Sequence, residues 1–290
     1  MSGASDLNES PSVYQALAAL EQANQGGALC TIVRSRGSTP RHTSSKMLVY
    51  MDGTTLGSVG GGELENRVLA AALQAIVDGK PCLLEYNMSD PQRGDPGVCG
   101  GQVEVFVEPL QPKPTLVVIG AGHVGRAIAH LAHWLGFRVV VSDDRTELCT
   151  PQATPDGDLY LPVPMAELPA HLEITPWTYL VLTTRGVSVD VEGLPVLLDT
   201  RAAYIGVIGS QRRWATARKQ MIAAGVPADK IERVRSPIGL ELNAETPEEI
   251  AVSVMAEIIM LRQGGDGAVM SVRYTEAARQ QNGEAGSLQD

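Results

Sequence analysis

Short, mainly apolar runs occur at regular intervals along the second half of the chain, with helical patterns between them. These runs span Leu116–Ile119, Arg138–Ser142, Tyr179–Thr183 and Tyr204–Ile208. Runs of this length predict buried strands, and their alternation with helices favours a parallel sheet with right-handed crossovers. We therefore predict an open parallel sheet between Thr115 and about Arg262, with the segment after its first strand at the carboxyl edge.

The best-marked helix of this half begins after Thr246. Thr246 and Glu249 have the spacing of a capping box, and Pro247 occupies the first helical position. The apolar stripe predicted to face the core consists of Ile250, Val254, Ile258 and Leu261. Beyond Gly264 the chain is polar, so we expect residues 265–290 to form a mobile tail.

The first part of the chain has a different pattern, with two helices and several short strands. The helices are predicted at Val13–Asn24 and Glu63–Asp78, and Gly79 supplies the left-handed residue that ends the second. The strands are predicted at Ala28–Arg34, Met47–Met51, Thr54–Ser58, Pro81–Tyr86 and Gln102–Glu108. Asp52-Gly53 joins the second and third strands as a hairpin.

A proline-rich segment separates the two parts. Pro109, Pro112 and Pro114 donate no backbone N–H, which makes residues 109–114 the best linker candidate. The predicted fold class is α/β, with a smaller N-terminal α/β domain and a C-terminal Rossmann-type parallel sheet. The predicted boundaries are 1–108 for the first domain, 109–114 for the linker and 115–264 for the Rossmann-type domain.

Composition excludes several classes of partner. The formal net charge of -10 and an aromatic content of 4% do not suit binding to nucleic acid or to anionic lipid. The N-terminus lacks the features of a signal peptide, and no run approaches the roughly 18 apolar residues of a membrane helix. The four cysteines are widely spaced and are expected to be reduced thiols. We expect a cytoplasmic protein.

A G-x-G-x-x-G motif follows the first strand of the second half. Its residues are Gly120, Gly122 and Gly125, and a helix with an apolar face follows them. This context is typical of the Rossmann fold, in which the second glycine and the free N–H groups of the helix N-terminus admit a phosphate. Asp143 or Asp144, at the end of the next strand, could hold a ribose. The alternative is a Rossmann-shaped domain whose crevice is empty or serves another purpose.

Other segments combine turn-forming residues with chemistry suited to a ligand. Ser210 is a plausible N-cap beside Arg212 and Arg213, which suits an anion but also ordinary capping. Cys99 lies in a glycine-rich segment, where its thiolate could reach a metal such as molybdenum or could be inert. The remaining candidates are Ser38 and Arg41 in one loop, Gly60, Gly61, Gly62 and Glu63 in another, and His123 inside the glycine motif. Cys30 and Cys82 lie in strand patterns and are predicted to be core residues.

These segments together resemble the xanthine dehydrogenase accessory family of the XdhC/CoxI type. The resemblance rests on residues 37–41, Lys46-Met47, 57–65, Cys99-Gly100-Gly101 with Glu104-Val105, 120–126, Asp144-Arg145, 204–210, 236–240 and 245–251. It spans nearly the whole ordered chain and adds Arg145 to the candidate cofactor-binding residues. The chain departs from the family at Ser44-Ser45, where Gly-Ala is more common.

The resemblance implies a maturation factor that binds molybdenum cofactor, protects it and delivers it in sulfurated form to a molybdenum hydroxylase. It also implies a cysteine desulfurase-type sulfur donor as a partner and a homodimer. Such a protein is an accessory factor more than an enzyme, and we assign no catalytic residue. The alternatives are an NAD(P)-dependent oxidoreductase, which lacks an evident Tyr-Lys or His-acid catalytic pair, and a non-catalytic nucleotide sensor.

Overall fold

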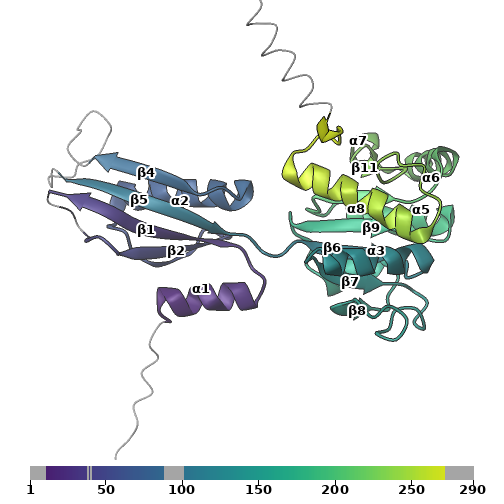
Figure 1. Cartoon of the computed structure of the whole chain (residues 1–290), viewed down its shortest axis with the longest axis horizontal. Coiled ribbons are helices and arrows are strands. Elements are labelled where there is room, and N and C mark those ends of the chain that lie inside the picture. Colours follow the sequence, from purple (N-terminus) through teal and green to yellow (C-terminus); the bar gives the residue numbers. More distant parts are fainter. Residues whose placement is uncertain (1–10, 38, 40, 88–100, 272–290) are drawn as a thin grey trace, which may run out of the picture. The chain divides into compact units, whose positions relative to one another are not determined.

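The chain folds into two compact units, residues 1–112 and 113–290 (Figure 1). The computed structural model describes residues 11–37, 39, 41–87 and 101–271. Within these residues no helix is long and apolar enough to cross a membrane.

The first unit contains a five-stranded antiparallel sheet with the order β3-β2-β1-β5-β4. Its strands are β1 (Gly27–Arg36), β2 (Lys46–Tyr50), β3 (Thr55–Gly57), β4 (Cys82–Asn87) and β5 (Gln102–Leu110). Helix α1 (Val13–Gln22) packs through Ala16 and Leu20 on Leu48 of β2, while α2 (Gly62–Asp78) lies along β1 and β5. The unit is therefore an antiparallel sheet with two helices packed against it.

Local signals in the sequence account for the ends of these elements. Gly79 adopts φ 65° and ends α2, as predicted, because a left-handed residue there lets its N–H reach the carbonyl of Ala75. The β2–β3 hairpin also forms as predicted, since the Asp52 carboxylate accepts the Thr54 N–H at 2.9 Å and Gly53 adopts φ 83°.

The predicted start of the linker is wrong. Strand β5 continues through Pro109 to Leu110 and pairs there with Gly27 and Ala28 of β1. Its other partner, β4, pairs only as far as Val107, so Pro109 lies where one side of the strand has no neighbour. A proline is tolerated in such an edge position because no ladder hydrogen bond is lost on that side.

The second unit is built on a parallel sheet of six strands in the order β11-β10-β9-β6-β7-β8, which confirms the Rossmann-type prediction. The strands are β6 (Thr115–Ile119), β7 (Arg138–Ser142), β8 (Leu159–Leu161), β9 (Thr178–Leu182), β10 (Tyr204–Val207) and β11 (Val234–Arg235). The helices are α3 (His123–Trp134), α4 (Leu168–His171), α5 (Val187–Leu198), α6 (Gln211–Ala223), α7 (Ala228–Ile231) and α8 (Pro247–Gln263), with a 3₁₀ turn η2 (Met165–Glu167).

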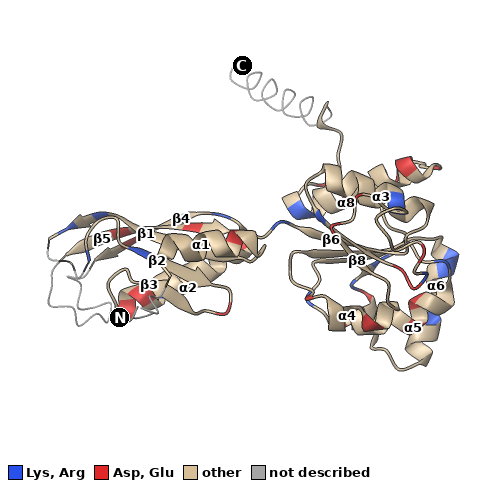
Figure 2. Ribbon diagram, turned by 90° about the horizontal axis from the view of Figure 1, so that it is seen from below, with Lys and Arg blue, Asp and Glu red and all other residues tan. Residues whose placement is uncertain are grey.

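The sheet has helices on both faces, and alternation along its strands determines which side chains meet which helices. Leu116 and Val118 of β6 pack with α3 and α8, whereas Val117 and Ile119 pack with α4, α5 and α6 on the other face. Figure 2 shows α3 and α8 on one side of the sheet and α4 and α5 on the other. A strand buried on both faces must be apolar throughout, which is why β6 appears in the sequence as a continuous run.

Strand β6 lies at the point where the order of the strands reverses. The chain runs from β6 outward through β7 and β8, then returns to β9 on the opposite side of β6. Loops at the carboxyl ends of β6 and β9 therefore diverge and leave a crevice, the position at which open α/β sheets bind ligands. Residues 120–125 follow β6 directly, so the predicted position of the glycine motif is confirmed.

The predicted stripe of α8 is only partly correct. Thr246 caps the helix with Glu249 as predicted, and Val254 and Ile258 are buried. Leu261, however, is 37% exposed. The helix is apolar on several sides, so its periodicity alone does not identify the buried face.

Candidate functional site

The three glycines of residues 120–125, here called the glycine loop, have three different physical roles. Gly120 adopts φ 110°, and a Cβ there would lie 2.6 Å from the Thr183 carbonyl oxygen. A Cβ on Gly125 would lie 2.0 Å from the Gly120 carbonyl oxygen, so this glycine permits α3 to pack against the end of β6. Gly122 adopts an ordinary φ of -72°, and a Cβ there would meet nothing within 4 Å. Packing therefore requires Gly120 and Gly125 but leaves Gly122 facing open space.

Asp143 fastens the glycine loop to the end of β7. Its buried carboxylate accepts the Ala121 N–H at 2.7 Å. The same carboxylate accepts hydrogen bonds from Nε and Nη2 of Arg145 at 2.9 and 2.7 Å. Both oxygens are thus used within the protein, so Asp143 orders the loop, whereas the side chain of the following Asp144 is 40% exposed.

Asp144 forms a two-pronged ion pair with Arg185 across the crevice, at distances of 2.6 and 2.7 Å. The hydrogen bonds and charge of Arg185 lower the pKa of Asp144 to about 2, so the carboxylate is ionised throughout the physiological range. Both side chains remain substantially exposed to solvent. Sequence reasoning missed Arg185, although a polar residue closely following an apolar strand at a switch point is a signal that could have identified it.

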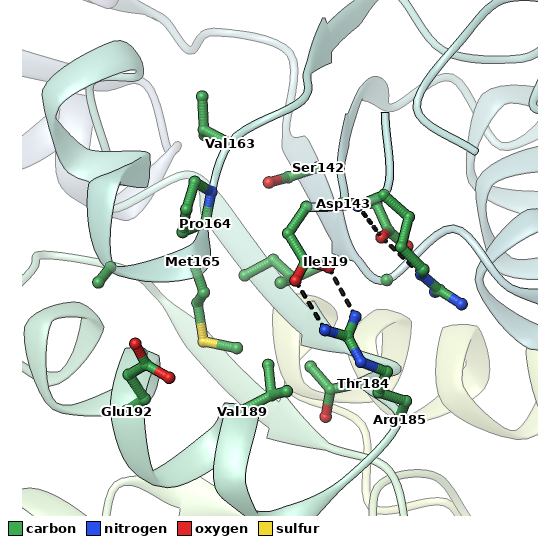
Figure 3. Close-up of a pocket in the computed structure, with 15 residues that line it drawn as sticks. Ile119, Ser142, Asp143, Val163, Pro164, Met165, Thr184, Arg185, Val189 and Glu192 are labelled. Atoms are coloured by element: carbon green, nitrogen blue, oxygen red, sulfur yellow. Dashed lines mark hydrogen bonds and ion pairs between the residues drawn. The ribbon is translucent and has the colours of Figure 1, made fainter. Parts of the chain in front are cut away.

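A cavity of about 210 Å³ adjoins the glycine loop (Figure 3). Its walls come from the ends of β6 and β7, residues 163–166 after β8, residues 184–185 after β9, and the first half of α5. Ser142 lines it, and the Ser142 hydroxyl is fully buried without a hydrogen-bond partner. In Figure 3 this hydroxyl points toward Val163 and Pro164. The segment 163–166 was not anticipated from the sequence, because the short strand β8 before it was missed.

The structure corrects the predicted anion site at residues 210–213. Ser210 caps α6 as predicted, by accepting the Arg213 N–H at 3.2 Å. The Arg213 guanidinium, however, binds the buried carboxylate of Asp190 at 2.7 Å and the hydroxyl of Thr184 at 2.8 Å. Arg212 is exposed on the helix surface. The two guanidinium groups therefore do not converge, and Arg213 is part of the internal structure of the unit.

The second glycine-rich loop, in the first unit, is organised by Glu65. This carboxylate accepts hydrogen bonds from the Ser58 hydroxyl at 2.6 Å and from the N–H groups of Val59 and Gly60 at 3.1 and 3.3 Å. Burial of Glu65 opposes ionisation, but these hydrogen bonds outweigh it and lower the pKa of the carboxyl group. The N–H groups at the start of this loop are thus already hydrogen-bonded to Glu65.

The rest of the loop is open to solvent. A side chain added at Gly61 or Gly62 would meet nothing within 4 Å, although both glycines have a positive φ. The Glu63 carboxylate pairs with Arg67 on the surface of α2 at 3.1 Å. The loop is therefore ordered from within by Glu65 and exposed on its outer side.

Of the remaining candidates, Arg41 is exposed after a turn in which the Thr39 hydroxyl donates to the Arg41 carbonyl. His123 is exposed at the first position of α3. Ser44 adopts φ 78°, a conformation that favours glycine. Ser38 and Cys99 lie outside the described residues. Among the described residues no group of three metal-ligating side chains comes together.

The buried position of Cys30 leads to a prediction about thiol reactivity. Burial, reinforced by the nearby Cys82, raises the pKa of Cys30 from 9.0 to about 12. At pH 8 the thiolate fraction should be about 1,000-fold smaller than for an unperturbed thiol. We expect alkylation of the native protein, followed by peptide mass spectrometry, to modify Cys82 well before Cys30. Equal rates in the folded protein, with both thiols equally reactive in denaturant, would show that Cys30 is accessible.

Comparison with known families places this site in context. Residues 116–258 match the XdhC Rossmann domain, and residues 20–87 match the XdhC and CoxI family. The two matches fall in the second and the first unit respectively, and together they span most of the chain. This chain belongs to the XdhC/CoxI family. The glycine loop and the crevice cavity are therefore features of an XdhC Rossmann domain.

Three relatives show how this XdhC/CoxI chain compares with longer proteins. It is 38% identical over 262 residues to the uncharacterized protein YqeB of Escherichia coli (strain K12), covering 89% of this chain and 48% of that protein. It is 33% identical over 159 residues to a probable xanthine dehydrogenase subunit of Bacillus subtilis (strain 168), covering 55% and 46% respectively. The chain thus spans about half the length of these two relatives. Its identity to the molybdenum cofactor insertion chaperone PaoD of Escherichia coli (strain K12) is 22% over 268 residues, covering 82% and 84%.

Proposed function

We propose that this protein is a maturation factor for molybdenum hydroxylases, which binds molybdenum cofactor, protects it and delivers it in sulfurated form to a xanthine-dehydrogenase-type client. Family membership supports this role. So do two relatives, of which one is named as a molybdenum cofactor insertion chaperone and the other as part of a probable xanthine dehydrogenase. The client hydroxylase and a cysteine desulfurase-type sulfur donor are the proposed partners, and the proposed working form is a homodimer in the cytoplasm.

The observation that carries the proposal is the open face of Gly122. A glycine that packing does not require, at the start of a twelve-residue helix and beside a cavity, fits the phosphate of a cofactor. Backbone N–H groups at the start of α3 would hold the phosphate, and the positive end of the helix dipole would favour its charge. Molybdenum cofactor supplies the metal and its exchangeable sulfur, while the chain supplies binding and protection from solvent.

The composition of the crevice favours a carrier over an oxidoreductase. Among the described residues that line the cavity there is no tyrosine, lysine, histidine or cysteine. Hydride transfer to or from a carbonyl group requires a proton donor at the reacting atom, and these residues are the usual donors. Two of the three acidic side chains in the lining are tied to arginines, Asp143 to Arg145 and Asp144 to Arg185.

What co-purifies with the full chain tests this function. We expect protein from cells that make molybdenum cofactor to carry molybdenum and a fluorescent pterin, and to activate a cofactor-free hydroxylase when mixed with it. The control is Asp199→Asn, which changes an exposed aspartate paired with Lys230 at the end of α5 and should leave all three properties unchanged. Protein that carries neither molybdenum nor pterin, and does not activate the hydroxylase, would contradict the proposal.

Cys99 and Cys30 should respond differently to the same substitution. If Cys99 contacts the molybdenum or its sulfur, Cys99→Ser replaces a soft thiolate with a hydroxyl and should reduce bound molybdenum by on the order of tenfold. Cys30→Ser instead buries a hydroxyl in the core and should cost about 1–3 kcal/mol of unfolding free energy. The measurements are metal analysis and thermal melts under reducing conditions. Cys99→Ser protein that retains its molybdenum would remove Cys99 from the proposed site.

A further inference from the structure

One face of the antiparallel sheet in the first unit is only partly covered by helices. Helix α2 packs on the other face, where its Arg67 guanidinium lies 5.1 Å from the centre of the Tyr86 ring. Helix α1 packs on this face around Leu48 of β2, and Figure 1 shows it beside β2 and away from β4. The uncovered part, here called the open sheet face, consists of Thr31 and Arg34 of β1, Phe106 and Glu104 of β5, and Leu83 and Glu85 of β4.

One row of the open sheet face is mainly apolar. Thr31, Phe106 and Leu83 are cross-strand neighbours in this row. Leu83 is 52% exposed, Phe106 is half-buried, and Val33 in the irregular part of β1 close by is 45% exposed. A single exposed apolar side chain is ordinary, but several that adjoin one another mark a surface that contacts another protein.

The next row of the open sheet face is charged. Arg34, Glu104 and Glu85 are cross-strand neighbours in that order. Nη1 of Arg34 lies 2.6 Å from the Glu104 carboxylate, whereas no cation pairs with Glu85 among the described residues. Like charges directly opposite each other in a sheet are destabilising. The row therefore ends in a carboxylate that a second guanidinium would stabilise.

The order of the strands makes the open sheet face complementary to itself. Strands β1 and β4 are the two neighbours of β5, so a two-fold axis that runs along β5, between two facing sheets, exchanges them. Phe106 of one copy then faces Phe106 of the second, and Thr31 of each copy faces Leu83 of the other. By the same symmetry Arg34 of each copy faces Glu85 of the other. Facing sheets lie about 10 Å apart, a distance that long side chains from both sides can bridge.

We propose that two copies of this chain associate through their open sheet faces, with Phe106 on the two-fold axis and Arg34 of each copy paired with Glu85 of the other. Each dimer then contains this ion pair twice, and the same surface serves both copies, as a two-fold interface requires. The inference rests on the homodimer of the proposed function and assigns it a surface that belongs to the first unit.

Sedimentation velocity of the full chain tests the proposal, because the charges of the pair can be reversed separately and then recombined. The wild-type protein should be a dimer. Arg34→Glu places two carboxylates together and Glu85→Arg two guanidinium groups, so each substitution alone should weaken the dimer by on the order of 100-fold. An equimolar mixture of the two variants should dimerise again, because the new carboxylate at position 34 meets the new guanidinium at position 85. A purely structural role for either residue would not produce this rescue.

Two further variants keep the test independent of folding defects. Asp78→Arg is the matched control, since it makes the same change of charge at an exposed position of α2, on the opposite face of the sheet, and should leave the dimer intact. Leu83→Ser removes an exposed apolar side chain without a change of charge and should weaken the dimer several-fold. Circular dichroism checks that each variant is folded.

A monomeric wild-type protein, single variants that dimerise like the wild type, or a mixture that stays monomeric would overturn the inference. A monomeric wild-type protein whose Arg34→Glu variant no longer activates the hydroxylase would also overturn it and would assign the open sheet face to the client. Molybdenum content and hydroxylase activation of the same samples test the maturation role separately, so a failure of the dimer is distinguishable from a failure of the proposed function.

Discussion

Replacing Arg213 with alanine should destabilise the second unit by roughly 3–5 kcal/mol, because it leaves the buried Asp190 carboxylate without its cation. Asp190 is fully buried and receives hydrogen bonds from the Arg213 guanidinium and the Thr184 hydroxyl. Arg213 also donates to the Thr184 carbonyl at 3.1 Å, so the substitution removes a support of the loop after β9 as well. This loop carries Arg185, and ligand binding in the crevice should weaken as a secondary effect.

Urea denaturation followed by tryptophan fluorescence measures this effect in the second unit alone, because all three tryptophans of the chain, Trp134, Trp177 and Trp214, belong to it. The matched control is Arg212→Ala, which removes an exposed arginine one position earlier and should change the unfolding free energy by no more than about 0.5 kcal/mol. If the two variants were equally stable and Arg213→Ala had lost affinity for anions, Arg213 would be a ligand-binding residue after all.

Two substitutions in the glycine loop should affect different properties: Gly125→Ala should reduce stability, whereas Gly122→Val should reduce ligand affinity. Gly125→Ala places a methyl group 2.0 Å from the Gly120 carbonyl oxygen and 2.9 Å from the Thr183 hydroxyl. One of these atoms belongs to the backbone and the other to a short side chain, so neither can move away easily. We therefore expect a loss of stability of about 1–3 kcal/mol or more. The Cβ of Gly122→Val meets open space. The free energy of unfolding of this variant should therefore lie within about 1 kcal/mol of the wild-type value, a difference that corresponds to a poor N-cap residue.

Ligand affinity should fall more in Gly122→Val than in Gly125→Ala, the reverse of the order for stability. The two methyl groups of Gly122→Val stand where a phosphate must approach the backbone, so affinity for the crevice ligand should fall by about 100-fold or more. The measurements are calorimetry and the molybdenum content of purified protein, each compared with a thermal melt. Gly122→Val protein that binds molybdenum cofactor as tightly as the wild type would show that this face of the loop is not used. Gly125→Ala protein as stable as wild type would contradict the close approach of α3 to β6.

The sequence by itself determined the strands and helix ends that depend on the chemical character of nearby residues alone. Strands β6, β7, β9 and β10 are almost completely buried on both faces, so they are mainly apolar, and their ranges could be predicted to within about a residue. The capping residues Ser210 and Thr246 also act as predicted, because a cap depends only on residues three positions away. The position of the glycine loop followed from the same logic, since a parallel sheet fixes which end of a strand each loop occupies.

Tertiary structure alone decided which side chains the crevice contains. Asp144 meets Arg185 across 41 positions, and Arg213 meets Asp190 across 23. The strands of a parallel sheet all end at the same edge, so segments that are distant in the chain meet there. Nothing in the local pattern distinguishes Arg212, which is exposed, from Arg213, which is half-buried and paired with a buried carboxylate. Likewise the different requirements of Gly120, Gly122 and Gly125 depend on where Thr183 and the end of β6 lie. Local periodicity determines the strands and helices, whereas the pairing of charges depends on packing between elements far apart in the chain.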